Sequence, residues 1–443
     1  MNVRVPALIL SLAAALAAQE ARPKMPLSFR KAIEITLAPD GSTKVQLAVE
    51  AIRQAQARKA EARSALLPNV DAAWTVQSFT SDLATFGLRI SLPIPGFQIP
   101  TFVGPISTYD LRATATQTVF DLSSIRRLQS AGATVSAVKL DSRESRLQAA
   151  ASAGKAYMNA ARAETAVQTA LANVELAGRE LRLAQRQKEA GTATGLDITR
   201  AEVELASEKQ RLIAAREDLE TSRLNLLRAM NLGLDLDFEL TDKLKYEPVE
   251  IPDPAKAVET AIGNRPDLKA QIERQRSAKL NYDAAKFQRL PSVTAFGNYG
   301  DIGLDPTLTR PTRTAGVSVH VPIFDGGRRD AQRAEASSEL RSEAIRSRDA
   351  RQQAELEVRT SIESLRSADE QARVRLEALQ LSEKELAQAQ RRFENGVTTN
   401  LEVTDAQTRL ARAREDYDTA VYTQRATRID LAAALGDIDE ISR

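Results

Sequence analysis

The chain contains no cysteine among its 443 residues, and it has one histidine and one tryptophan. Without thiols it can form neither a disulfide framework nor a thiolate metal site, and it cannot carry a lipid on an N-terminal cysteine. The lone histidine, His320, has no second histidine or cysteine with which to complete a metal or catalytic site. We therefore predict that the chain holds no metal and no cofactor.

An excess of charge of either sign is also missing, because 61 Lys and Arg residues stand against 59 Asp and Glu residues. A nearly neutral chain has no electrostatic footprint for nucleic acid, which is excluded as a partner. Gly326 and Gly327 open a helix after a predicted strand, but the Lys and Ser/Thr of a nucleotide-binding loop do not follow them. These absences predict that the protein is not an enzyme.

The N-terminal stretch contains the one long apolar run of the chain. Arg4 precedes the run Val5 to Ala17, which ends in the small-residue pattern Ala-Leu-Ala. The run is shorter than the ~20 residues that span a bilayer, which favours a signal peptide over residues 1–17 and not a membrane anchor. No later run is apolar and long enough to form a transmembrane helix.

An internal duplication dominates the rest of the chain, at an offset of 205 residues, the separation of Gly191 and Gly396. The matching pairs include Glu180/Glu385, Leu181/Leu386, Arg186/Arg391, Leu196/Leu401, Ile198/Val403, Thr199/Thr404, Ala201/Ala406 and Leu226/Leu431. One unit has been used twice. We predict a first repeat over residues 18–232, a mixed segment over 233–254 and a second repeat over 255–443.

Each repeat contains a long helix, a glycine turn and a return helix. The incoming helices are expected from about residue 123 to 190 and from about 327 to 395, and at ~1.5 Å per residue each is about 100 Å long. Apolar residues recur at the coiled-coil period along the second of them: Val358, Leu365, Ala372, Leu379, Leu386 and Phe393. The return helices open with the capping-box patterns of Thr194 to Asp197 and Thr399 to Glu402. The hairpin tips therefore lie near residues 191 and 396.

Each repeat also contains two predicted strands, placed at 69–79 with 108–120 and at 292–300 with 313–324. A Leu-Pro pair, ending at Pro68 or Pro291, stops the helix before each pair of strands. Apolar and polar residues alternate along all four strands, which therefore present one apolar and one polar face. His320 lies on the polar face.

The apolar face of these strands needs a cover. A soluble two-layer protein would show the same alternation, but the long helices carry only narrow apolar seams and supply no second layer, which favours lipid. Of 19 aromatic residues, seven lie between Trp74 and Phe120 and three between Phe296 and Phe324, as interfacial belts require. Four strands cannot close a barrel of useful bore, so we infer an oligomer. The proline-rich loop at 80–107 is a plug, a surface contact or a packed cap.

The order of helix, Leu-Pro, strand, loop, strand ending in Phe-Asp, long helix, glycine turn and return helix, all repeated, resembles the outer-membrane efflux protein family of TolC-like outer-membrane factors. The stretches that carry the resemblance are Asn264 to Leu268, Leu290 to Val293, Val321 to Arg328 and Gly396 to Ala406. The first repeat departs from the pattern, because Ala38 to Gly41 stands where a run like Asn264 to Leu268 is expected. Phe120-Asp121 also lacks the two glycines that follow Phe324-Asp325.

The resemblance implies an α+β fold in which three chains form one twelve-stranded β-barrel in the outer membrane, continued by a long α-helical coiled-coil barrel through the periplasm. Such a homotrimer contacts outer-membrane lipid. It serves as the exit duct of a tripartite efflux or secretion system, with a periplasmic adaptor and an inner-membrane transporter. Small molecules, metals and proteins all stay open as substrates.

The resemblance also implies where a gate would lie. Glu402 and Asp405 match acidic positions that ring the periplasmic end of the duct, and we assign Asp197, Arg200 and Phe393 to the same gate. Asp197 repeats the acid of the second half, whereas Arg200 replaces it, which permits a salt link between the halves. The residues alone favour a capping role for Glu402 and a solvated helix position for Asp405.

The glycine turns are the expected contact of the adaptor, through Gly191 and Thr192 in the first hairpin and Gly396 and Val397 in the second. A rival interpretation is a periplasmic coiled-coil structural or adaptor protein without a pore. It explains the heptads and the signal peptide, but it leaves the four alternating strands unexplained.

Overall fold

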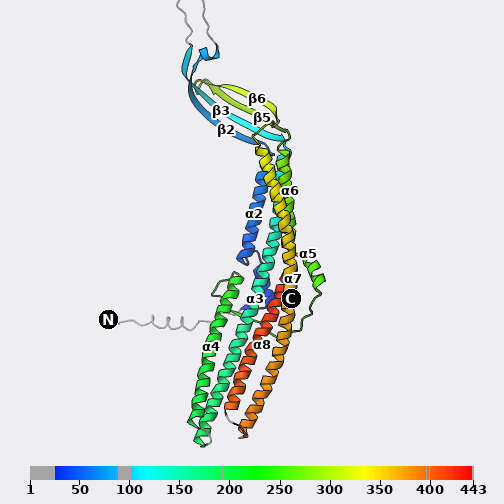
Figure 1. The fold of residues 1–443 in the computed structure, drawn as a ribbon. Coiled ribbons are helices and arrows are strands. Elements are labelled where there is room, and N and C mark those ends of the chain that lie inside the picture. The colour runs from blue at the N-terminus through cyan, green and yellow to red at the C-terminus, as the bar shows by residue number, and fades with distance from the viewer. Residues whose placement is uncertain (1–24, 88–100, 192–193, 396, 399, 442–443) are drawn as a thin grey trace, which may run out of the picture. The chain divides into compact units, whose positions relative to one another are not determined.

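The computed structural model describes residues 25–87, 101–191, 194–395, 397–398 and 400–441 (Figure 1). The predicted signal peptide and residues 88–100 of the proline-rich loop lie outside the described residues. The elements are β1 (Met25–Leu27), α1 (Phe29–Leu37), α2 (Thr43–Ser64), β2 (Asn69–Asp82), the 3₁₀ helix η1 (Leu83–Phe86), β3 (Phe102–Phe120), α3 (Leu122–Glu189), α4 (Gly195–Ala229), β4 (Phe238–Leu240), α5 (Pro254–Asn264), α6 (Pro266–Phe287), β5 (Ser292–Gly303), β6 (Arg310–His320), α7 (Arg328–Glu394), α8 (Asn400–Leu435) and α9 (Ile438–Ile441).

The chain divides into two compact units. One contains Met1–Glu50, Leu140–Lys269 and Asp349–Arg443, and the other contains Ala51–Lys139 and Ala270–Arg348. The first holds α4, α8 and most of α3 and α7, and the second holds the four-stranded sheet and the N-terminal parts of α3 and α7. None of the helices within the described ranges is both long enough and apolar enough to cross a membrane.

The four-stranded sheet is antiparallel throughout, in the order β2-β3-β5-β6 (Figure 1). Cross-strand partners share a face, and successive residues alternate between faces. The register therefore places Val70, Trp74, Val317 and Val319 on one side. The opposite side carries the polar set Asp71, Thr75, Arg112, Thr114, Thr116, Thr118, Thr294, Asn298, Thr312, Thr314, Ser318 and His320. The alternation read from the sequence is present in the fold.

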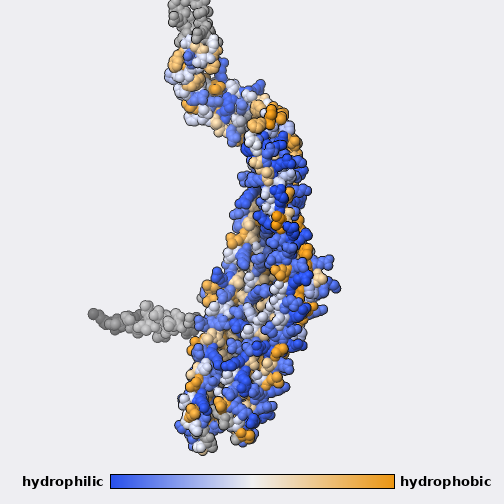
Figure 2. Space-filling model, in the orientation of Figure 1, coloured by the Kyte–Doolittle hydropathy of each residue, from blue (hydrophilic) through white to orange (hydrophobic). Residues whose placement is uncertain are grey.

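The described part of the chain leaves the apolar side of the sheet uncovered. Trp74 is 72% exposed, Val70 69% and Val317 68%. Large apolar side chains in water cost free energy, so exposure of this kind marks a surface that another apolar phase or chain covers. Figure 2 shows apolar residues in separate patches among polar ones, several of them over the strands.

The strand bounds differ from those expected at 108–120 and 313–324. β3 begins earlier, at Phe102, because pairing with β2 resumes beyond a bulge between Phe79 and Ser81. β6 ends earlier, at His320. Pro322 follows it, and proline has no N–H to donate to a neighbouring strand, so the expected strand end at residue 324 is wrong.

The long helices of the structure are α3 with 68 residues and α7 with 67 residues. The sequence predicts these two helices at about 123–190 and 327–395. Their apolar seams are filled largely by alanine on α3, such as Ala153 and Ala160, and by larger residues on α7, such as Val358 and Leu365. Small side chains let neighbouring backbones approach closely, and the larger ones fill wider gaps.

Several small clusters form the core of the hairpin-containing unit. One joins α1, α3, α4 and the short parallel β1–β4 pair around Tyr157 and Phe238, both fully buried. Tyr157 donates to the carbonyl of Leu27 at 3.0 Å and to Asp242 at 3.0 Å. Burial and the Asp242 carboxylate raise the pKa of this phenol. The mixed segment between the repeats is thereby tied to the N-terminal strand.

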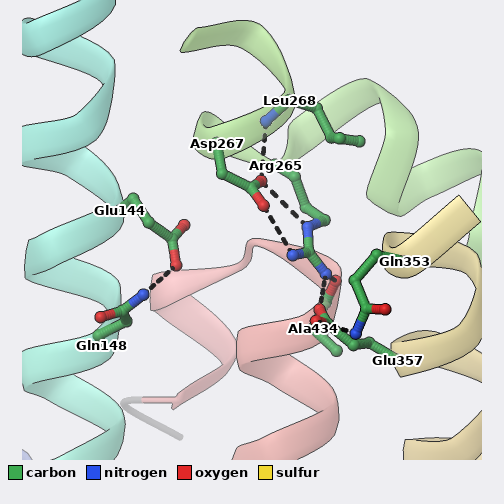
Figure 3. A network of polar contacts seen from close by, with 8 residues as sticks. All are labelled: Glu144, Gln148, Arg265, Asp267, Leu268, Gln353, Glu357 and Ala434. Carbon is green, nitrogen blue, oxygen red and sulfur yellow. Dashed lines mark hydrogen bonds and ion pairs between the residues drawn. The ribbon is translucent and has the colours of Figure 1, made fainter. Parts of the chain in front are cut away.

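The corner between α5 and α6 is fixed by Arg265 (Figure 3). Its guanidinium donates to both oxygens of Asp267, at 3.1 and 2.7 Å, and to Glu357 on α7 at 2.6 Å. Burial alone would lower the pKa of Arg265, but the bonds to Asp267 and Glu357 raise it above its ordinary value. Gly436, with φ of 75°, packs against the Arg265 backbone, where a Cβ would come within 2.9 Å. The Asn264 to Leu268 motif therefore anchors α7 and α8 to this corner.

Candidate functional site

The tip of the α3–α4 hairpin is a turn followed by a cap. Gly191 has φ of 74°, a conformation that glycine adopts at little cost. Thr194 and Asp197 form the expected capping box: the Asp197 carboxylate accepts from the Thr194 N–H at 2.9 Å, and the Asp197 N–H donates to the Thr194 hydroxyl at 3.4 Å. The Thr194 hydroxyl also donates to the Asp197 carboxylate at 2.7 Å, and this bond, together with the one from the Thr194 N–H, lowers the pKa of Asp197. Thr192 lies outside the described residues.

Arg200 does not link the two halves in the structure. Its side chain is exposed, and it makes no ion pair with any residue that the structure describes. Asp197, three positions earlier, is committed to its cap. Neither Asp197 nor Arg200 therefore forms an ion pair with the other hairpin within the described residues.

The tip of the α7–α8 hairpin is held by Glu402. Its carboxylate accepts from Arg392, near the end of α7, at 2.8 Å, and from the Thr398 hydroxyl. The Val397 N–H donates to the Arg392 carbonyl at 2.9 Å, and the Val397 side chain is exposed. Gly396 and Thr399, the expected turn and cap residues, lie outside the described residues. Glu402 thus ties the two helices together across the turn.

Asp405 lies one turn further along α8. It is exposed, and none of the described residues forms a hydrogen bond or ion pair with it. Glu402 and Asp405 are three positions apart, so they lie near one another on the helix surface. The Asp405 carboxylate is therefore available to bind a group on another chain, whereas the neighbouring Glu402 is already paired with Arg392.

Phe393 belongs to the core of the second hairpin. It packs with Leu386, Ala389, Val403 and Leu410, and Leu176 of α3 contacts the same cluster. A cavity of about 330 Å³ adjoins it, lined by Leu176, Arg179, Glu180, Leu183, Ala184, Gln187, Gln390, Phe393 and Val403. The side chain therefore sits where the two hairpins meet.

Glu180, which lines this cavity, is a residue that the sequence did not single out. Burial, and secondarily the charge of Glu204, raise the pKa of Glu180 to about 7. Its buried Oε1 has no hydrogen-bond partner among the described residues. In the sequence, Glu180 stands out only as the repeat match of Glu385. The effect of Glu204 on it cannot be predicted from the sequence, because Glu204 lies on a different helix.

Ion pairs cross-link α7 and α8 along their length. Those described are Arg392–Glu402 at 2.8 Å, Arg409–Glu385 at 2.8 Å, Arg414–Glu383 at 3.8 Å and Arg375–Asp416 at 2.8 Å. Each is partly exposed and contributes little alone, but a row of pairs opposes separation of the two helices. A gate that opens by splaying would have to break them.

The polar face of the sheet carries a network around Arg112. The guanidinium donates to Asn298 on β5 at 2.6 Å, to Thr312 on β6 at 3.0 Å and to Asp110 at 3.2 Å. A charged group spanning three strands is stable beside water or other polar groups and costly against lipid. This side of the sheet is therefore suited to face an aqueous space.

Comparisons with known proteins agree with this arrangement. The sequence profile described as "Outer membrane efflux protein" matches residues 36–232 and 257–437. The pyoverdine export outer membrane protein OpmQ of Pseudomonas putida is 24% identical over 409 residues, covering 91% of this chain and 84% of that protein. The toluene efflux pump outer membrane protein TtgC of Pseudomonas putida is 23% identical over 265 residues; the match covers 57% of this chain and about half, 53%, of that protein.

Solved structures show the same fold at lower sequence identity. The Campylobacter jejuni CmeC outer membrane channel superposes with a TM-score of 0.79 at 16% identity, over 92% of this chain and 85% of that one. The outer membrane protein VceC of Vibrio cholerae gives a TM-score of 0.75 at 19% identity, over 92% and 96%. The rival of a coiled-coil protein without a pore does not fit these matches. The profile match over most of the chain shows that it belongs to the outer membrane efflux protein family, whose members are transport channels of the outer membrane.

Proposed function

We propose that three copies of this chain form one twelve-stranded barrel in the outer membrane and a helical duct below it. One observation carries the proposal: the sheet has an exposed apolar face and, among the described strands, β2 and β6 each pair on one side only. Open strand edges expose unpaired N–H and C=O groups, which cannot be left in lipid. Pairing β2 of one copy with β6 of the next satisfies both edges. Each of the two repeats, 18–232 and 255–443, supplies two strands and one helical hairpin.

The duct closes at the hairpin tips. In a trimer, Glu402 and Asp405 would come from three copies to one axis, where a ring of carboxylates attracts cations. The Arg392–Glu402 pair and the Arg409–Glu385 pair hold each second hairpin closed. Opening requires a partner that binds the splayed state more tightly.

That partner is a periplasmic adaptor, which delivers substrate from an inner-membrane transporter. The names of the relatives, an exporter of pyoverdine and a component of a toluene efflux pump, support export of small molecules. The exposed Val397 and the Gly191 turn are the surfaces offered to the adaptor at the two tips. Thr192 and Gly396, their neighbours in the sequence, belong to the same proposed contact.

Barrel closure can be tested by disulfide cross-linking, because the chain has no cysteine of its own. Ala72→Cys on β2 would be combined in turn with Ala315→Cys, Val317→Cys or Val319→Cys on β6. Oxidation in the membrane should give covalent dimers and trimers on a denaturing gel for at least one register. The matched control combines Ala72→Cys with Ala295→Cys, because β3 lies between β2 and β5. Monomers in every register would refute the barrel.

The gate is tested by conductance across a planar bilayer. The Glu402→Ala/Asp405→Ala variant should conduct severalfold more than the native trimer, because both the latch and the acidic ring are lost. Glu370→Ala/Glu415→Ala removes the same charge from exposed positions away from the tips and should leave conductance unchanged. Equal conductance of the tip variant and the native trimer would refute the gate.

A further inference from the structure

A cavity of about 290 Å³ lies where the strands meet the helices of the sheet-containing unit. It is bounded by the first turns of α3 and α7, the end of α6 and the adjoining ends of β5 and β6. Its lining residues are Asp121, Ser123, Arg127, Gln288, Leu290, Ser292, His320, Pro322, Arg328, Arg329 and Gln332. Polar groups predominate, and three of them are arginines.

Two of these arginines are available to a ligand. Arg127 is exposed and makes no ion pair with any residue in the described part of the chain. Arg328 is 68% exposed in its side chain and only reaches Asp325 at 4.0 Å, whereas Arg329 is committed to Asp325 at 3.1 Å. A guanidinium presents a planar set of donors that matches carboxylate and phosphate oxygens.

The one carboxylate that lines the cavity is already engaged. Asp121 caps α3: one oxygen accepts from the Ser123 N–H at 3.0 Å and the other from the Ser124 hydroxyl at 2.5 Å. Its negative charge opposes an incoming anion, but its oxygens are turned to the helix end. The arginines outnumber it among the lining residues.

Ser123 supplies an independent indication of a ligand. The residue is 3% exposed, it lines the cavity, and its Oγ has no hydrogen-bond partner within the described residues. A buried hydroxyl without a partner costs free energy, and an acceptor oxygen in the cavity would satisfy it. The N-termini of α3 and α7 both border the cavity, and their dipoles favour negative charge there.

The sheet register shows which side the cavity serves. His320 pairs with Ser292, and both lie on the polar side of the sheet, with Thr294 and Ser318. The exposed Val319 lies on the opposite side. If the apolar side meets lipid, as the proposed function requires, the cavity opens to the aqueous interior and not to lipid headgroups.

We propose that this cavity is an oxyanion-binding site, which receives the phosphate or carboxylate group of a dissolved solute where the barrel meets the helical duct. Arg127 and Arg328 bind the oxygens, and the Ser123 hydroxyl donates to one of them. The proposed occupant is a solute in transit, so the site would favour passage of anionic cargo. The assignment of the occupant as dissolved solute rests on the proposed function, whereas oxyanion binding does not.

The probe is inorganic phosphate, titrated into the detergent-purified full-length trimer by isothermal calorimetry. Arg127→Gln should weaken phosphate binding about tenfold, the loss expected for one charge-assisted contact. Ser123→Ala should weaken it severalfold with no change of charge and no cost to the helix. Arg341→Gln, an exposed arginine further along α7, should bind as the native protein does. The absence of saturable binding, or equal weakening by Arg341→Gln, would overturn the site.

A second arm separates the two sources of phosphate. Native mass spectrometry with added phosphatidylglycerol should show no lipid whose retention depends on Arg127 or Ser123. Lipid retained by the native trimer and lost in both variants would overturn the dissolved-solute assignment. Phosphate binding by a protein whose β2 and β6 do not cross-link between copies in any register would refute the barrel and leave the oxyanion site standing.

Discussion

The two helical hairpins share a backbone plan but differ in the charges at matching positions. In α7–α8, Arg409 grips both oxygens of Glu385, at 2.8 and 3.2 Å. The matching positions of α3–α4 hold Glu180 and Glu204, two acids, and the pKa of Glu180 rises to about 7. One hairpin carries an opposite-charge pair at this position, whereas in the other burial, and secondarily the charge of Glu204, favour the protonated form of Glu180.

The two halves also differ at the corner before the strands. The second half has Arg265 bound to Asp267 and Glu357, and the first half has Ala38 to Gly41 at the corresponding place. In both comparisons the second half carries the stronger polar connections. Duplication preserved the length and turns of the unit, and substitution at single positions then made one half firmer than the other. We therefore expect α3–α4 to be the first hairpin to loosen.

The largest effect should come from removing the corner of the second half. Arg265→Ala leaves Asp267 and Glu357 without their cation, and because both are partly exposed we expect a loss of about 2 to 3 kcal/mol. The thermal midpoint, followed by circular dichroism, should fall. Arg341→Ala, an exposed arginine on the same helix as Glu357, is the control and should leave the midpoint in place. An unchanged midpoint for Arg265→Ala would show that the corner is not a firm point.

Glu204→Arg should convert the first hairpin to the chemistry of the second. The new guanidinium would face Glu180 as Arg409 faces Glu385, and at pH 8 we expect a local gain on the order of 1 to 2 kcal/mol. Hydrogen-exchange protection of α3 and α4 amides measures it. Glu202→Arg makes the same charge change at an exposed position and should have little effect. Equal protection in the two variants would contradict the comparison.

The native hairpin should also be pH-dependent, in a direction that the Glu180 pKa fixes. Its folded pKa is about 7, against 4.5 for the ordinary carboxyl. Below about pH 4.5 the Glu180 carboxyl is protonated in both the closed and the open hairpin, and it does not change the free energy of closing. As the pH rises to 7, the open hairpin loses this proton first, which destabilises the closed hairpin. Protection factors in α3–α4 should fall between pH 5 and 8, whereas those of α7–α8, where burial raises the pKa of Asp418 to about 6, should fall as the pH rises towards 6 and hold above it. Glu180→Gln should flatten the dependence, and a slope that survives it would assign the effect to another group.

The smallest effect should distinguish the two tips. Asp197→Ala removes the capping box and should cost about 0.5 to 1 kcal/mol of local stability at the start of α4. Asp405→Ala removes an acid without a described partner and should cost less than about 0.5 kcal/mol. Proteolysis rates at the tips, compared with the native chain, would order the two. A larger loss for Asp405→Ala in the isolated trimer would indicate a partner in a neighbouring copy.

Much of this protein follows from local pattern. The glycine offset, the heptads and the Thr194–Asp197 capping box indicated the hairpins and their tips, because helix period and turn chemistry are properties of short stretches. The period-2 alternation likewise fixed which strand residues share a face, His320 included. Local pattern did not determine the strand ends, because pairing across strands decides where a strand stops. β6 ends at His320, two residues before Pro322.

Tertiary structure alone decided which side chains meet. Arg265 reaches Glu357, 92 positions along the chain, and Ser123 comes to border one cavity with Arg328. The charge of Glu204, on another helix, contributes to the raised pKa of Glu180. Such contacts depend on how packed helices are rotated and shifted along their axes. The period of an apolar seam does not determine that rotation and shift, whereas close packing of the whole core does. The sequence therefore determined the elements and their duplication, and packing determined the polar contacts that make the halves behave differently.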